Sequence, residues 1–171
     1  MRYSMIAAIA LAAIPAASFA ADPQWGYYSD EKVTKGLLQA AVQSKDGEQL
    51  IFKCEKKGKG EVVAVLYSKS AFSAPATKYI LRPVTVQVDK GRAMEQRWRY
   101  FGNTITAVDM KNERTLTTLL GEMEKGSELH IRVNPETGVS YEITFPVQGG
   151  KEAVSRVYES CGDTYPIATA A

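Results

Sequence analysis

Residues 79–100 read YILRPVTVQVDKGRAMEQRWRY, and their alternating pattern determines the fold class that the chain can adopt. Apolar residues recur at every second position from Val84 to Val88, with polar residues between them. After the Asp-Lys-Gly step, Trp98 and Tyr100 alternate with arginines. A period of two is typical of a half-buried strand, so this stretch predicts an antiparallel hairpin with one buried and one solvated face.

Strand character extends over most of the chain, and two segments have a helical period instead. Further strands are predicted at residues 25–28, 36–43, 49–54, 61–67, 103–108, 128–134 and 138–145, the last with Val139, Tyr141, Ile143 and Phe145 on one face. The run at 61–67 is apolar on both faces, which favours a covered central strand. Apolar spacing at i, i+3, i+4 and i+7 predicts helices near residues 116–123 and 150–160.

These segments predict a mainly β protein with two helices, of the α+β class. The sheet is expected to be an antiparallel β-sandwich or a strongly curved sheet. A single domain is expected over residues 21–161, because 141 residues can bury a sizeable core. The small, polar segment 162–171 is predicted to be a flexible tail.

The N-terminus has the pattern of a cleaved export signal at residues 1–20. Arg2 precedes a short apolar run, and Ser18-Phe19-Ala20 fits the small-x-small rule for cleavage after Ala20. The apolar run is too short to span a bilayer, where about 20 residues are needed. We therefore expect a product that does not span the membrane after cleavage and is located in the periplasm.

The charge balance argues against a nucleic-acid partner. The chain has 21 basic and 19 acidic side chains, and one of the basic residues, Arg2, belongs to the predicted signal. Such a balance offers no bulk attraction to phosphate backbones.

The two cysteines, Cys54 and Cys161, predict an intramolecular disulfide. In an exported protein that has only two cysteines, a bond between them is the favoured state. Cys54 ends a predicted strand and Cys161 ends the last predicted helix, so the bond would fix that helix to the sheet. A redox role is not favoured, because the chain has no C-x-x-C pair.

The chain resembles the periplasmic TagO/VasI-like proteins associated with type VI secretion. The resemblance rests on residues 84–93, 96–98, 116–120, 129–133, 144–145 and 153–154 before Cys161, on residues 50–54, and on Trp25 with Ser29-Asp30. It implies an envelope accessory protein. The chain departs from the family pattern in having only Asp30-Glu31 as its acidic pair and in lacking a tryptophan near Tyr67.

No residue pattern predicts a catalytic site, a cofactor or a metal site. His130 is the only histidine, and metal ligands normally occur as clusters at defined spacing. Alternation places His130 on the solvated side of its strand. A His130-dependent hydrolase is the less favoured alternative, because no G-x-S-x-G elbow is present.

Arginines on the solvated face form the candidate partner surface. The set comprises Arg92, Arg97, Arg99, His130 and Arg132, and the alternative is ordinary cross-strand pairing with Glu95 and Glu142. We expect a non-enzymatic binding or accessory protein that engages an unidentified envelope or periplasmic protein. The first alternative is an inhibitor of a periplasmic hydrolase, with residues 56–60 or 70–75 as the inserting loop.

Overall fold

The computed structural model describes residues 24–30, 37–54, 61–69, 72, 74–110, 113–135 and 138–167. The predicted signal at 1–20 lies outside these residues. The elements of the described part, in chain order, are β1 (Gly26–Asp30), β2 (Leu37–Gln43), β3 (Gln49–Cys54), β4 (Val62–Tyr67), β5 (Ile80–Val88), β6 (Met94–Phe101), β7 (Thr104–Ala107), α1 (Thr115–Met123), β8 (Glu128–Val133), β9 (Tyr141–Pro146) and α2 (Gly150–Cys161).

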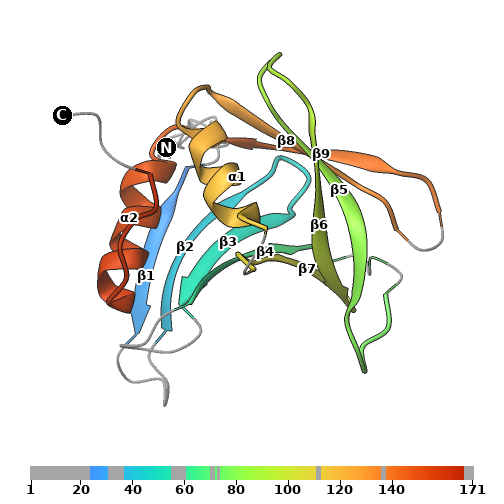
Figure 1. Cartoon of the computed structure of the whole chain (residues 1–171), viewed down its shortest axis with the longest axis horizontal. Coiled ribbons are helices and arrows are strands. Elements are labelled where there is room, and N and C mark those ends of the chain that lie inside the picture. Colours follow the sequence, from blue (N-terminus) through green and yellow to red (C-terminus); the bar gives the residue numbers. More distant parts are fainter. Residues whose placement is uncertain are drawn as a thin grey trace, which may run out of the picture.

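The strands form one antiparallel sheet in the order β1-β2-β3-β4-β7-β6-β5-β8-β9. All paired neighbours run antiparallel, and the hairpin predicted at residues 79–100 is the β5–β6 pair. Figure 1 shows the sheet bending strongly, so that β8 and β9 cross over the ends of β2 and β3. The curved sheet, rather than a two-sheet sandwich, is therefore the observed architecture.

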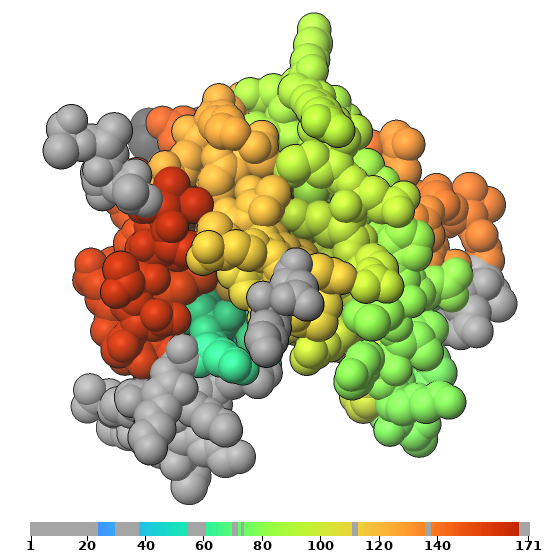
Figure 2. Space-filling model, viewed as in Figure 1, coloured from blue at the N-terminus to red at the C-terminus, as the bar shows by residue number. Residues whose placement is uncertain are grey.

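The face of the sheet that packs against both helices is called the core face, and the opposite one the outer face. Trp98 and Tyr100 of β6 are fully buried on the core face, as their alternation predicted. In β4 the residues from Val62 to Leu66 are all buried, which confirms a strand covered on both sides. Figure 2 shows α1 filling the space between α2 and the β5–β6 hairpin.

The strand predicted at 138–145 begins later than expected. Val139, predicted on the apolar face, is 86% exposed, and β9 starts only at Tyr141. Gly138 has a φ of +108°, a conformation that glycine adopts readily and that does not continue a strand. The turn between β8 and β9 therefore extends past Val139, which is the reason that its side chain faces solvent.

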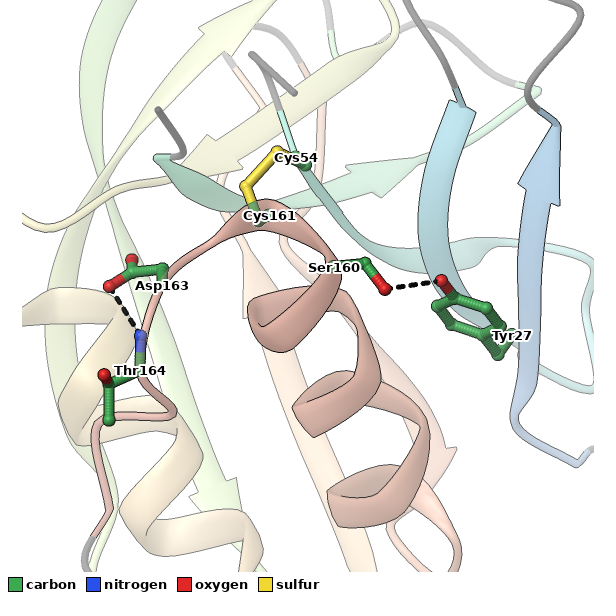
Figure 3. Close-up of a disulfide and its surroundings, with 6 residues drawn as sticks. All are labelled: Tyr27, Cys54, Ser160, Cys161, Asp163 and Thr164. Carbon is green, nitrogen blue, oxygen red and sulfur yellow. Dashed lines mark hydrogen bonds between the residues drawn. A yellow bond between two sulfur atoms is a disulfide. The ribbon is translucent and has the colours of Figure 1, made fainter. Parts of the chain in front are cut away.

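The disulfide joins the end of β3 to the end of α2. Cys54 and Cys161 are bonded across 107 positions of sequence, with their Cα atoms 5.8 Å apart (Figure 3). At the residue before Cys161 in α2, the Ser160 hydroxyl is hydrogen-bonded to the Tyr27 hydroxyl at 2.9 Å. The last helix is thus attached to both β1 and β3.

The predicted tail is partly packed. Tyr165 meets the ring of Tyr158 edge-on, with centroids 5.6 Å apart, and Ile167 lies against the core. Residues 168–171 lie outside the described part. In the described ranges, no helix is long and apolar enough to cross a bilayer.

Candidate functional site

The arginine surface predicted from sequence is divided between two strands. Arg97 and Arg99 lie on β6, and His130 and Arg132 lie on β8, with β5 between them. Alternation places all four on the outer face, opposite the buried Trp98 and Ile131. The fifth residue, Arg92, is exposed in the turn of the β5–β6 hairpin, which projects from the body of the molecule (Figure 1).

Each of the three strand arginines has a local partner. Arg97 donates to Glu113 Oε1 at 2.6 Å, and Arg132 donates to Glu142 Oε2 at 3.1 Å. Arg99 lies over the ring of Tyr79, 5.1 Å from its centroid. The Arg132–Glu142 pair is the cross-strand contact expected from alternation. These pairs are solvent-exposed, so they contribute little stability, and their guanidinium groups remain accessible to a partner.

His130 lies among acidic side chains at one end of the sheet. Its Nδ1 is 3.1 Å from Thr144 Oγ1 and 3.4 Å from Glu142 Oε1, while its Nε2 is 3.9 Å from Glu128 Oε2. The side chain is 22% exposed, so the ring is more enclosed than its position on the solvated face predicted. It borders a hollow of about 970 Å³ that extends to Trp25 and the β2–β3 turn.

The surroundings of His130 provide negative charge and hydrogen-bonding groups. Within the described part of the chain, the hydrogen-bond and ion-pair partners of the His130 ring are two carboxylates and one threonine hydroxyl. Those same ranges contain no group of three or more potential metal ligands. The His130-dependent hydrolase therefore remains a prediction.

An apolar cluster beside Arg99 was missed by sequence reasoning. Tyr79, Leu81 and Phe101 are 55%, 43% and 44% exposed, which is unusual for large apolar side chains. Leu81 pairs with Arg99 across the β5–β6 hairpin, the Tyr79 ring lies against the Arg99 guanidinium, and Phe101 is two residues after Arg99 on the same side of β6. We call these four residues the outer patch. Its rings border a hollow of about 510 Å³ that continues over β7 and β4.

The two loops considered for an inhibitor contribute little to the described surface. Residues 56–60 lie outside the described part, as do 70, 71 and 73. Phe72, between them, is fully buried and stacks on Tyr141 with ring centroids 6.4 Å apart. This side chain is therefore not available to enter an active site.

Taken together, these features define a disulfide-closed α+β domain built on one curved antiparallel sheet, with a mixed apolar and arginine surface outside. A family model described as YfjT matches residues 23–154. The chain belongs to the YfjT family. Comparison with curated proteins and with solved structures gives no match.

Proposed function

We propose that this protein is a non-enzymatic binding module of the periplasm that engages another envelope protein through the outer patch. The observation that carries the proposal is the grouping of three exposed large apolar side chains around Arg99. Aromatic residues and arginine are enriched at protein interfaces and supply most binding hot spots. A soluble protein rarely exposes such a group without a partner for it.

The sheet register makes the outer patch continuous. Arg99 stands opposite Leu81 on one side and Thr106 on the other, and Phe101 stands opposite Thr104. The patch therefore lies on the hydrogen-bonded strands β5 and β6 and borders Thr104 and Thr106 of β7, and a surface held by a sheet loses little conformational entropy when a partner binds. Arg97, two residues from Arg99 on the same face, adds a charged rim.

The proposed compartment rests on the export pattern at residues 1–20 and on the disulfide. Disulfides persist in oxidising compartments such as the periplasm and are rare in the cytosol. An association with type VI secretion is the narrower form of this proposal, and it rests only on the resemblance of the sequence to TagO/VasI-like proteins.

The proposal is tested by cross-linking and affinity capture. The full chain with a C-terminal tag is expressed in its source cell, and captured proteins are compared between wild type and variants. The variants are Leu81→Glu and the double change Arg97→Glu with Arg99→Glu. Lys125→Glu is the matched control, because Lys125 is exposed and follows α1, on the other side of the sheet.

One stoichiometric envelope protein is expected with wild type and with the control. Leu81→Glu and the double variant should reduce its recovery at least tenfold while circular dichroism remains unchanged. Equal recovery with all variants would show that the outer patch is not the binding surface. Capture of a hydrolase that the protein inhibits would favour the inhibitor, and an enzymatic activity lost in His130→Ala would favour the hydrolase.

A further inference from the structure

Among the described residues, one edge of β9 has backbone groups that pair with no other strand. β9 is the last strand of the sheet, and only β8 pairs with it among the described strands. Beyond the strand, Val147 N–H donates to Ser127 O at 2.8 Å. Val147 and Ser127 continue the register of β9 and β8, so this bond identifies a hydrogen-bonded residue pair. Hydrogen-bonded and non-hydrogen-bonded pairs alternate along an antiparallel ladder, so the other odd-numbered residues of β9 also bond to β8. The N–H and C=O groups of Glu142 and Thr144 therefore point away from the sheet.

One end of this edge is already closed. The carbonyl of Pro146 accepts a hydrogen bond from Trp25 Nε1 at 2.8 Å, and proline has no N–H to offer. Proline and charge are the usual means of blocking an exposed sheet edge. Here Pro146 blocks only its own position, so Glu142 and Thr144 retain four groups in strand geometry.

The hollow of about 970 Å³ lies along the same edge. Glu142, Thr144 and Pro146 form one wall of it, and Lys45 and Asp46 of the β2–β3 turn contribute to its lining as well. An extended segment placed at hydrogen-bonding distance from β9, about 4.8 Å away, would occupy this space.

The charged side chains that line the hollow favour a cationic partner. Its lining contains three carboxylates, those of Asp46, Glu128 and Glu142, and one lysine, Lys45. Glu142 is paired with Arg132, whereas Asp46 and Glu128 have no lysine or arginine partner among the described residues. Two carboxylates are thus available to cationic side chains.

We propose that the β9 edge binds an extended, lysine- or arginine-rich peptide segment as an additional strand. In strand addition, backbone hydrogen bonds supply affinity and the side chains at alternate positions supply specificity. Alternate residues of the segment would direct their cationic side chains toward Asp46 and Glu128. This site shares no residue with the outer patch and does not depend on the proposed function.

The first test uses fluorescent hexapeptides and the full oxidised chain. Binding of an alternating Lys-Val peptide is measured by anisotropy against a Glu-Val peptide and against a Lys-Val peptide N-methylated at alternate residues. We expect the Lys-Val peptide to bind at least tenfold more tightly than either comparator. Equal binding of the methylated peptide would overturn strand addition, and equal binding of the Glu-Val peptide would overturn the charge selection.

The second test uses variants of the edge and of the charges. Thr144→Pro removes an outward N–H without removing a bond to β8, and Thr144→Val keeps that N–H as the matched control. We expect at least a tenfold loss of Lys-Val binding with proline only. Asp46→Lys combined with Glu128→Lys should reverse the preference in favour of Glu-Val, a gain that an unfolded variant could not show. Wild-type affinity in Thr144→Pro, or no reversal in the lysine variant, would refute the proposal.

Discussion

Trp25 Nε1 donates a hydrogen bond of 2.8 Å to the carbonyl oxygen of Pro146, across 121 positions of sequence. This bond joins the residue before β1 to the last residue of β9, the two edge strands of the sheet. The Trp25 ring also packs on Phe52, with centroids 5.8 Å apart. The sheet is therefore held in its curved form by a contact between its two edges, in addition to its continuous ladder.

Trp25→Phe should lower the free energy of unfolding by about 1–2 kcal/mol, because the Pro146 carbonyl loses its donor while most of the ring packing is kept. Urea unfolding followed by circular dichroism measures the change. Tyr28→Phe is the control, since Tyr28 is 54% exposed on β1. Equal stability of Trp25→Phe and wild type would show that the edge contact does not stabilise the sheet.

Replacing both Cys54 and Cys161 by alanine should destabilise the protein by up to about 4.7 kcal/mol, the chain-entropy limit for a loop of this length. The urea midpoint of the double variant is compared with that of wild type. Wild type treated with a phosphine reductant should approach the same midpoint. If the oxidised and reduced proteins unfold together, the bond does not contribute to stability.

Asp89 should make the protein sensitive to acid. Backbone N–H groups of Glu128 and Ser127 and the Ser127 hydroxyl donate to its carboxylate and hold the pKa of Asp89 below its usual range. A lowered folded pKa means that stability is present above the unfolded pKa, about 3.9, and is lost as the pH falls through the folded value.

Asp89→Asn should therefore reduce the dependence of unfolding free energy on pH below about pH 4. Asparagine is the appropriate replacement because residue 89 has a φ of +48°, which asparagine tolerates. Urea unfolding from pH 2.5 to pH 6 provides the measurement. An unchanged pH profile in the variant would assign the acid sensitivity to other carboxyl groups.

Asp109→Ala should lower the free energy of unfolding by about 1 kcal/mol, the usual cost of losing a helix cap. The Asp109 carboxylate accepts the backbone N–H groups of Leu116 and Thr117, at 2.6 and 3.2 Å, at the start of α1. Thr117→Val removes only the hydroxyl bond to Asp109 and should have the smaller effect. A larger loss in Thr117→Val would contradict the capping role.

Phe72→Ala should cost about 3–5 kcal/mol, the range for a fully buried phenylalanine. The ring contacts Tyr100 edge-on and stacks on Tyr141, so its removal leaves a cavity between β6 and β9. Thermal unfolding measures the loss, and Phe101→Ala on the exposed outer patch is the control. Similar effects of the two changes would contradict the anchoring of this segment in the core.

Alternation predicted the elements well where one face of a strand is buried. Trp98 and Tyr100 were assigned correctly because alternation and burial agree there, and the strand at residues 61–67 was assigned correctly because its run is apolar on both faces. Val139 was misplaced because the alternating pattern continues into the turn between β8 and β9, which extends past Val139. A curved sheet was one of the two architectures predicted, but the choice between it and a sandwich could not be made, since the curvature depends on contacts such as Trp25 with Pro146 that are remote in sequence.

The candidate site was predicted only in part. Residue type and alternation located Arg97, Arg99 and Arg132 on the outer face and indicated Glu142 as a partner, but not Glu113 or Tyr79. Glu113 reaches Arg97 from the connection before α1, which no strand pattern can indicate. The outer patch depends on the register that places Leu81 beside Arg99. A signal for it was present in sequence, since Leu81 shares the parity of Thr85 and Gln87, the solvated positions of its strand.

The position of the disulfide has a consequence for the order of events during synthesis. Cys54 is made early, and its partner emerges only after the nine strands that the structure describes and nearly all of α2 have been produced. Until then Cys54 has no other thiol in the chain with which to pair. Oxidation therefore reports that translation has passed Cys161, and a chain truncated before that residue would keep a free thiol that quality-control enzymes can recognise.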